Sequence, residues 1–195
     1  MKVTLKVTCA LTCLAAGSPL VADTAQSDLI GVWQTGLTEA QAPGGGPSAY
    51  LRQTTVFTDT LQDIRAEIFA DADGQMLIFT YASSGPYMPV GASDVVPGAL
   101  NLELINETSE VTIYMDVPDL MAAVGMGDCD LILNEAINVR DCISGPPFLV
   151  TDCTDLDLVL VDHGGSRLRF GDQSIDRCIS RPTELDAAQF FKVEQ

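Results

Sequence analysis

Basic side chains are scarce in this sequence. Its 195 residues include ten Lys and Arg against 27 Asp and Glu, so the formal net charge is −17 at pH 7. Such a chain is repelled by nucleic acids and by anionic membrane surfaces, which bind through clustered basic residues. We therefore expect no nucleic-acid partner. Solubility in a salty or extracellular setting explains the acidity best, and a cation-binding role is the less favoured alternative.

The residues and motifs of common catalytic centres are also rare. His163 is the only histidine and lies in a turn sequence, DHGG, without a partner motif. There is no GxSxG, HExxH, Walker or Rossmann pattern, and no CxxC pair that would suit zinc. Asp155 and Asp157 could serve glycoside hydrolysis, but 27 acidic residues make chance pairs common. We expect a protein that is not an enzyme and holds no metal or cofactor.

Long apolar runs are missing beyond the first residues. Residues 1–22 combine Lys2 and Lys6 with an apolar run over residues 7–16 and small residues before Asp23. This arrangement is typical of a secretory signal peptide, cleaved after Ala22 or after Gly17. The run is too short to span a membrane. We expect residues 23–195 to form one β-barrel domain that is secreted or periplasmic and has no membrane span.

Four of the six cysteines lie beyond the predicted signal peptide: Cys129, Cys142, Cys153 and Cys178. An even number in an exported protein indicates two disulfides, and three connectivities are possible. We favour Cys129–Cys142 with Cys153–Cys178, because the other pairings would tie more distant segments together.

Alternation of apolar and polar residues is abundant. It marks residues 63–69, 99–105, 110–116, 156–162 and 166–172, where for example Leu156, Leu158 and Leu160 form the apolar set. A period of two with one polar face predicts antiparallel strands. The sequences DADG at 71–74 and DHGG at 162–165 predict hairpin turns. Gly/Pro-rich residues 42–49 and 83–99 predict loops, and helical periodicity is limited to 117–126 and 183–191. This pattern indicates a β-sandwich or a β-barrel.

One predicted strand, MLIFTY at 76–81, is apolar on both faces. Ile78 lies on one face, and Leu77, Phe79 and Tyr81 lie on the other. Such a strand is either covered on its outer face or lines a roomy apolar cavity. A packed core and a cavity account for these residues equally well.

Gly31 and Trp33 form a Gly-x-Trp pattern in the predicted first strand, as in lipocalins. A closer resemblance is to the adenomatosis polyposis coli down-regulated 1 domain family, whose domains are lipocalin-like barrels. The similar segments, in order over about residues 28–190, are LIGVWQT, APGGGPSAYLRQTTVF, GPYMPVGASDVVPGALNLEL, CDLILNEAINVRDC and RFGDQSIDRCISRPTEL. Two cysteines of the family pattern are absent, one of them where Gly36 and Leu37 stand, and Leu133 replaces an expected Trp.

The resemblance implies a single antiparallel lipocalin-like β-barrel, closed at one end by Trp33, with short helices and an apolar ligand. Animal members of the family carry two such domains and a membrane anchor, and they antagonise Wnt signalling by holding its lipid. With one domain and no anchor expected here, only the fold and the idea of an apolar ligand are carried over.

The sequence thus predicts an exported binding protein that holds an acyl chain or a similar apolar ligand. The alternative is a structural or protein-interaction domain with a filled core. The partner would be an apolar small molecule or an acyl group, which an acylated protein could carry. The predicted cavity residues lie on apolar strand faces or on a loop at the mouth: Trp33, Ile64, Ile68, Ile78, Tyr87, Val95, Leu102 and Ile113.

Overall fold

The computed structural model describes residues 23–41, 48–143, 153–162 and 164–194. The predicted signal peptide, most of the predicted loop at 42–49 and His163 lie outside these residues. The described part is all-β with two short helices, α1 (Gln26–Leu29) and α2 (Pro118–Ala123). Its strands are β1 (Gly31–Thr35), β2 (Thr38–Gln41), β3 (Ser48–Phe57), β4 (Leu61–Phe69), β5 (Leu77–Ala92), β6 (Leu100–Leu104), β7 (Thr108–Ile113), β8 (Ala136–Asn138), β9 (Asp155–Val161), β10 (Arg167–Phe170) and β11 (Phe190–Lys192).

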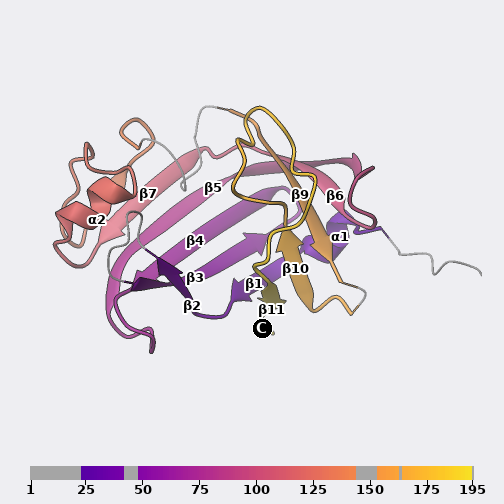
Figure 1. Ribbon diagram of the computed structural model, residues 1–195. Coiled ribbons are helices and arrows are strands. Elements are labelled where there is room, and N and C mark those ends of the chain that lie inside the picture. Colours follow the sequence, from indigo (N-terminus) through magenta and orange to yellow (C-terminus); the bar gives the residue numbers. More distant parts are fainter. Residues whose placement is uncertain (1–22, 42–47, 144–152, 163, 195) are drawn as a thin grey trace, which may run out of the picture.

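Eight of these strands close into an antiparallel barrel (Figure 1). The order around the ring is β1, β3, β4, β5, β6, β9, β10 and β11, and β11 pairs again with β1. Successive ring strands are neighbours, as in an up-and-down barrel. β2 folds back on β3, while β7 and β8 extend outside the ring from β5. The predicted all-β barrel is confirmed, and its closure leaves no open sheet edge in the ring.

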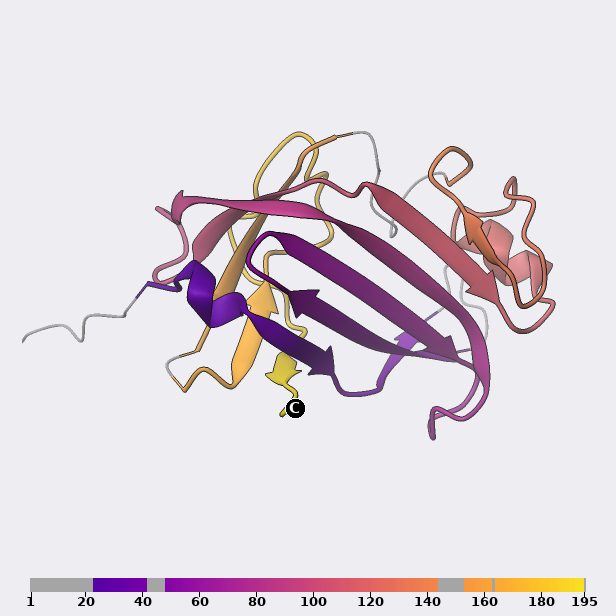
Figure 2. The same cartoon turned by 180° about the vertical axis from the view of Figure 1, so that it is seen from behind.

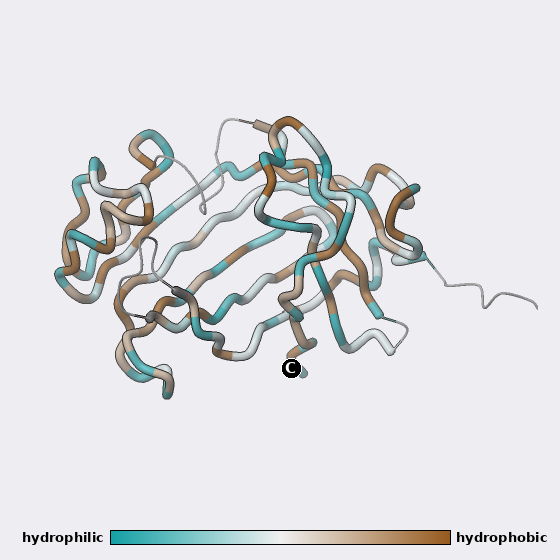
Figure 3. The backbone as a smooth tube through the Cα atoms, in the orientation of Figure 1, coloured by the Kyte–Doolittle hydropathy of each residue, from teal (hydrophilic) through white to brown (hydrophobic). Residues whose placement is uncertain are grey.

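The predicted hairpin turns are present. Between β4 and β5, Gly74 has a φ of 66°, and its amide donates to the Asp71 carbonyl at 3.2 Å. Between β9 and β10, Gly165 has a φ of 64° and donates to the Asp162 carbonyl at 2.8 Å. Glycine adopts this left-handed conformation without steric cost. Hydrophobic and hydrophilic residues both occur along the strands of the ring (Figure 3), and β4 alternates between them.

Strand β5 shows that the loop predicted at 83–99 was wrong over its first ten residues. The strand runs for 16 residues from Leu77 to Ala92; its first half pairs with β7 and its second half with β6. A Cβ on Gly85 would lie 1.7 Å from the Ile105 carbonyl oxygen, so only glycine fits there. The Gly and Pro residues that suggested a loop instead permit a close backbone approach and a bend within a strand.

Trp33 closes one end of the barrel. It is fully buried among Phe57, Leu102, Leu168 and other apolar residues. Its indole Nε1–H donates to the Leu29 carbonyl of α1 at 2.6 Å. Trp33 is therefore buried at one end of the barrel, and its indole N–H has a partner.

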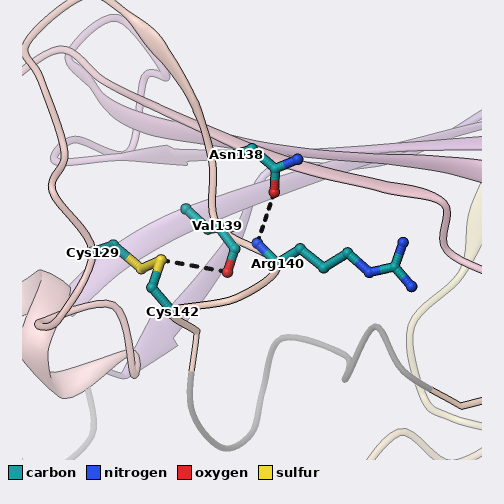
Figure 4. Close-up of a disulfide and its surroundings, with 5 residues drawn as sticks. All are labelled: Cys129, Asn138, Val139, Arg140 and Cys142. Atoms are coloured by element: carbon teal, nitrogen blue, oxygen red, sulfur yellow. Dashed lines mark hydrogen bonds between the residues drawn. A yellow bond between two sulfur atoms is a disulfide. The ribbon is translucent and has the colours of Figure 1, made fainter.

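A second apolar cluster lies toward the end opposite α1, where α2 and β8 project beyond the ring (Figure 2). Phe79, Val111, Met121 and Val139 are among its buried members. The predicted disulfide Cys129–Cys142 is present beside this cluster (Figure 4). It closes the loop over residues 129–142, which follows α2 and contains β8.

The helix predicted at 183–191 was wrong. Asp172 N–H donates to the Glu184 carbonyl and Asp186 N–H donates to the Phe170 carbonyl, so this segment runs beside the end of β10. It then enters the ring as β11, between β10 and β1. Main-chain pairing that completes the barrel outweighs a weak helical pattern. The second predicted disulfide, Cys153–Cys178, is also present and links the start of β9 to this C-terminal region.

Candidate functional site

A cavity of about 1030 Å³ lies within the barrel. Pockets for small molecules typically measure about 300–1,000 Å³, so the cavity can hold one sizeable ligand. Its walls are inward-facing side chains of the ring strands, completed by α2 and by residues of the C-terminal segment. The apolar lining includes Leu51, Ile64, Ala66, Ile68, Phe79, Leu104, Leu120, Val124, Phe170 and Phe190, and the polar lining includes Gln53, Thr55, Gln62, Ser83, Asn106, Asp155, Asp157, Gln173 and Arg177.

The apolar lining forms one continuous wall. Leu51 on β3 is paired with Ile68 on β4, which is paired with Phe79 on β5. Side chains two residues apart on a strand face the same side, so Ile64 continues this wall along β4. Leu120 adds an apolar side chain from α2.

Neutral polar side chains continue the wall beyond the apolar part. Gln62 Nε2 donates to Thr55 Oγ1 at 3.1 Å, and Ser83 Oγ donates to Asn106 Oδ1 at 2.8 Å. All four residues are buried. Buried polar groups cost little when they satisfy one another in this way, so they can give the cavity a polar surface without destabilising the barrel.

Arg177 is the charged centre of the polar lining. Its Nη1 lies 2.5 Å from Asp157 Oδ2, and its Nη2 lies 3.1 Å from Asp155 Oδ2. The three side chains are between 2% and 4% exposed. The neighbouring Cys178 is bonded to Cys153, which fixes Arg177 beside the start of β9. Such a group is stable only where good geometry offsets the loss of hydration.

Asp157 has a full set of hydrogen-bond donors. Its Oδ1 accepts from the main-chain N–H groups of Leu158, at 2.7 Å, and Gly171, at 3.1 Å. Its Oδ2 accepts from Gln173 Nε2 at 3.2 Å as well as from Arg177. Burial raises the pKa of Asp157, and Arg177 opposes that rise. With its oxygens occupied, this carboxylate holds β9, Gly171 and Arg177 together.

Asp155 differs from Asp157 in one respect. Its side chain is equally buried and lines the cavity, but its Oδ1 has no hydrogen-bond partner among the described residues. Burial raises the pKa of this carboxyl from 3.8 to about 6, Arg177 opposes the rise and Asp157 adds to it. An unpaired acceptor inside a cavity is a group that a bound molecule can satisfy.

Two of the eight predicted cavity residues, Ile64 and Ile68, line the cavity. Trp33 and Leu102 lie in the closed-end core instead. Tyr87 lies there too; its hydroxyl donates to the Thr58 carbonyl at 2.8 Å, and burial raises its pKa.

The other three predicted residues also lie away from the cavity lining. Ile78 and Ile113 belong to the second apolar cluster. Ile78 lies on the face of β5 that is turned away from the cavity, and Ile113 lies on β7, which is outside the ring. Val95 is 56% exposed in the connection after β5. The alternation rule put Ile78 on the wrong face because β5 is covered by apolar residues on both sides, so that Phe79 and Tyr81 are the residues turned inward.

The polar lining was missed for a similar reason. In β9 the leucines at 156, 158 and 160 were taken as the core face, whereas Asp155, Asp157 and Val159 face inward. Leu158 is also fully buried, so β9 has no clearly polar, solvent-exposed face from which its inward-facing residues could be predicted. Two acidic residues in phase with Val159 were the available signal. Nothing in the sequence pointed to Arg177 as their partner.

Comparisons with known proteins place the chain in no family: no family model matches it, and no curated protein does. No helix in the described part of the chain is long and apolar enough to cross a membrane. Among the described residues, no three His, Cys, Asp or Glu side chains gather as a metal site.

Proposed function

We propose that this chain is an exported, non-enzymatic binding protein that holds an acyl chain or a similar apolar ligand in its barrel. The cavity of about 1030 Å³ with its continuous apolar wall is the observation that carries this proposal. A structural or interaction domain with a filled core would not need such a space. We also propose that the chain is related to the adenomatosis polyposis coli down-regulated 1 domain family. The order of the similar motifs and the barrel fold support this proposal.

The energetics are favourable for a long chain. Each buried methylene contributes about 0.8 kcal/mol, while association costs several kcal/mol in lost freedom. Micromolar affinity is therefore within reach of the apolar wall alone. The ligand would be free or attached to a partner protein as an acyl group.

The proposed location is secreted or periplasmic. Two disulfides fit an oxidising compartment, and the predicted signal peptide at residues 1–22 would direct export. All four cysteines of the described residues are paired in these two disulfides. This arrangement supports folding in an oxidising environment.

The test is titration of the purified protein with a fluorescent acyl probe, together with native mass spectrometry for a co-purified lipid. Ile68→Trp places an indole in the apolar wall and should weaken probe binding at least tenfold. Met88→Trp is the matched control, because Met88 is 56% exposed and its indole would lie outside the cavity. Absence of saturable binding in the wild-type protein at probe concentrations well above micromolar would favour the filled-core alternative.

A further inference from the structure

The charged groups around Asp155 do not balance. Asp155 and Asp157 share one guanidinium, that of Arg177. Arg181 is the next cation; its Nη1 donates to the main-chain oxygens of Leu102 and Asp157, and its Nη2 lies 4.0 Å from Glu103. With all of these groups ionised, three carboxylates face two guanidinium groups, which leaves one negative charge.

The free charge has a defined position. Asp157 is saturated by four donors and Glu103 faces Arg181. Asp155 lines the cavity, and its Oδ1 is buried without a partner among the described residues, so a small shift of the side chain would bring this oxygen to a bound molecule. Asp155 pairs with Leu104 across β6 and β9. Asn106 follows Leu104 by two residues and also lines the cavity, so a carboxylate and an amide lie near each other on one wall.

We propose that Asp155 recognises the head group of the bound amphiphile, and that this head group is a hydrogen-bond donor. A protonated amine fits best, and a hydroxyl group is the second choice. The inference rests on the proposed function, because the chain of the same molecule would lie against Leu51, Ile68 and Phe79. The donor of the head group supplies the partner that Asp155 Oδ1 lacks, and an ammonium also neutralises the remaining charge.

The same arrangement discriminates against anionic heads. A carboxylate or phosphate placed at Asp155 would face a like charge in a site of low dielectric, where repulsion is strong. Nη1 and Nη2 of Arg177 already hold Asp157 and Asp155, so its buried Nε–H is the one donor of this guanidinium without a partner among the described residues. A single N–H does not remove the surplus negative charge. A free fatty acid is therefore expected to be a poor ligand even though its chain fits the apolar wall.

The experiment compares decylamine, 1-decanol and decanoate, which share one chain length and differ in the head group. Their affinities are measured at pH 7.5 by displacement of the fluorescent acyl probe, below the concentrations at which they aggregate. The expected order is decylamine, decanol, decanoate, with at least tenfold between the first and the last. Asp155→Asn should remove most of the amine preference, since the amide is neutral and keeps the shape of the side chain.

Asp63→Asn is the matched control, because Asp63 is exposed on β4 and its loss changes the net charge by the same amount. It should leave the ranking unchanged. Circular dichroism of both variants shows whether they fold as the wild type does. If Asp155→Asn fails to fold, the ranking in the wild-type protein decides alone. Equal affinities of the three ligands, or a preference for decanoate, would overturn the role of Asp155 while leaving the binding function intact. If neither the three ligands nor the fluorescent probe binds, both the role of Asp155 and the proposed binding function are overturned.

A pH titration gives an independent readout. Decylamine stays protonated from pH 5 to 8, whereas Asp155 gains its proton near pH 6. The other ionisable groups of the cavity lining are Asp157, Arg177, Asp186, Tyr50 and Tyr81. Amine affinity should fall severalfold as the pH drops from 7.5 to 5 in the wild type and stay flat in Asp155→Asn. A flat profile in the wild type would exclude Asp155 as the partner of the amine.

Discussion

Trp33 and Asp155 are both buried, but their polar atoms are in opposite situations. The indole N–H of Trp33 has the Leu29 carbonyl as its partner, whereas Asp155 Oδ1 has none among the described residues. An unsatisfied buried polar group costs about 1–3 kcal/mol. Trp33 therefore stabilises the closed end of the barrel, whereas Asp155 destabilises the cavity. A ligand that donates a hydrogen bond to Asp155 would remove this cost and so raise the stability of the barrel.

Trp33→Ala is expected to lower the free energy of unfolding by about 3–5 kcal/mol, the range for a fully buried aromatic residue. The substitution leaves a void among Phe57, Leu102 and Leu168. Denaturant melts followed by circular dichroism measure the loss. Tyr114→Ala is the comparison, because Tyr114 is 38% exposed, and its loss should stay under about 1 kcal/mol. A similar small loss for Trp33→Ala would mean that the closed end does not depend on the indole.

Asp155→Asn should change how stability depends on pH. The folded state holds the Asp155 proton up to about pH 6, whereas the unfolded state releases it near pH 4. Between these values the folded state binds more protons, so this group makes the wild type less stable as the pH rises. The free energy of unfolding of the wild type relative to Asp155→Asn should fall by up to about 3 kcal/mol from pH 4 to pH 7.

Urea melts at several pH values measure this difference. Asp63→Asn removes an exposed carboxylate from β4, away from Asp155 on β9, and should retain the wild-type profile. Parallel profiles for the wild type and Asp155→Asn would show that the folded state does not retain the Asp155 proton.

At the scale of the elements, β5 determines how the barrel is assembled. It pairs with β4 along one edge and with β7 and then β6 along the other. The change of partner brings the connection between β6 and β7 against Gly85, where Ile105 N–H and Glu107 N–H donate to carbonyls of β5. The backbone of this connection takes the place that a side chain would need.

Gly85→Ala should therefore be strongly destabilising, by at least about 2 kcal/mol, because backbone atoms must move to accept the methyl group. Gly36→Ala is the control: a Cβ there has nothing within 4 Å, so the change should stay within about 0.5 kcal/mol. Urea unfolding of the two variants gives the comparison. A tolerated Gly85→Ala would mean that the connection at Ile105 adapts easily.

The elements also show how far the sequence reaches. Alternation, hairpin turns and cysteine spacing predicted the strands, the turns and both disulfides, because each depends on local chemistry. The strand nature of Ser83–Ala92 and of β11 could not be predicted, because it depends on pairing with distant strands. The same limit applies to the cavity: Ile64 and Ile68 were found from one clear alternating strand, whereas Asp155 and Arg177 meet only through the folded C-terminal segment.

The whole molecule is one closed hydrogen-bonded ring. β11 is the last described strand, and it pairs with β10 on one side and with β1, the first strand, on the other. Opening that seam would expose the cavity and the closed-end core, which includes Trp33, Leu168 and Phe190. We therefore expect binding and folding to be coupled. A ligand held in the cavity has no equivalent site in the unfolded chain.

A ligand that binds only the folded state raises stability by about 2.7 kcal/mol at a concentration one hundred times its Kd. For a domain of 150–250 residues, about 1 kcal/mol shifts the melting temperature by roughly 2–4 °C. Decylamine at that concentration should therefore raise the melting temperature by about 5–11 °C, while decanoate at the same concentration should have a much smaller effect. Differential scanning calorimetry at pH 7.5 measures both. The shift should shrink in Ile68→Trp, whose indole occupies the apolar side of the cavity, and persist in Met88→Trp. An unchanged melting temperature in wild-type protein saturated with the fluorescent probe would show that ligand binding in the cavity is not coupled to folding.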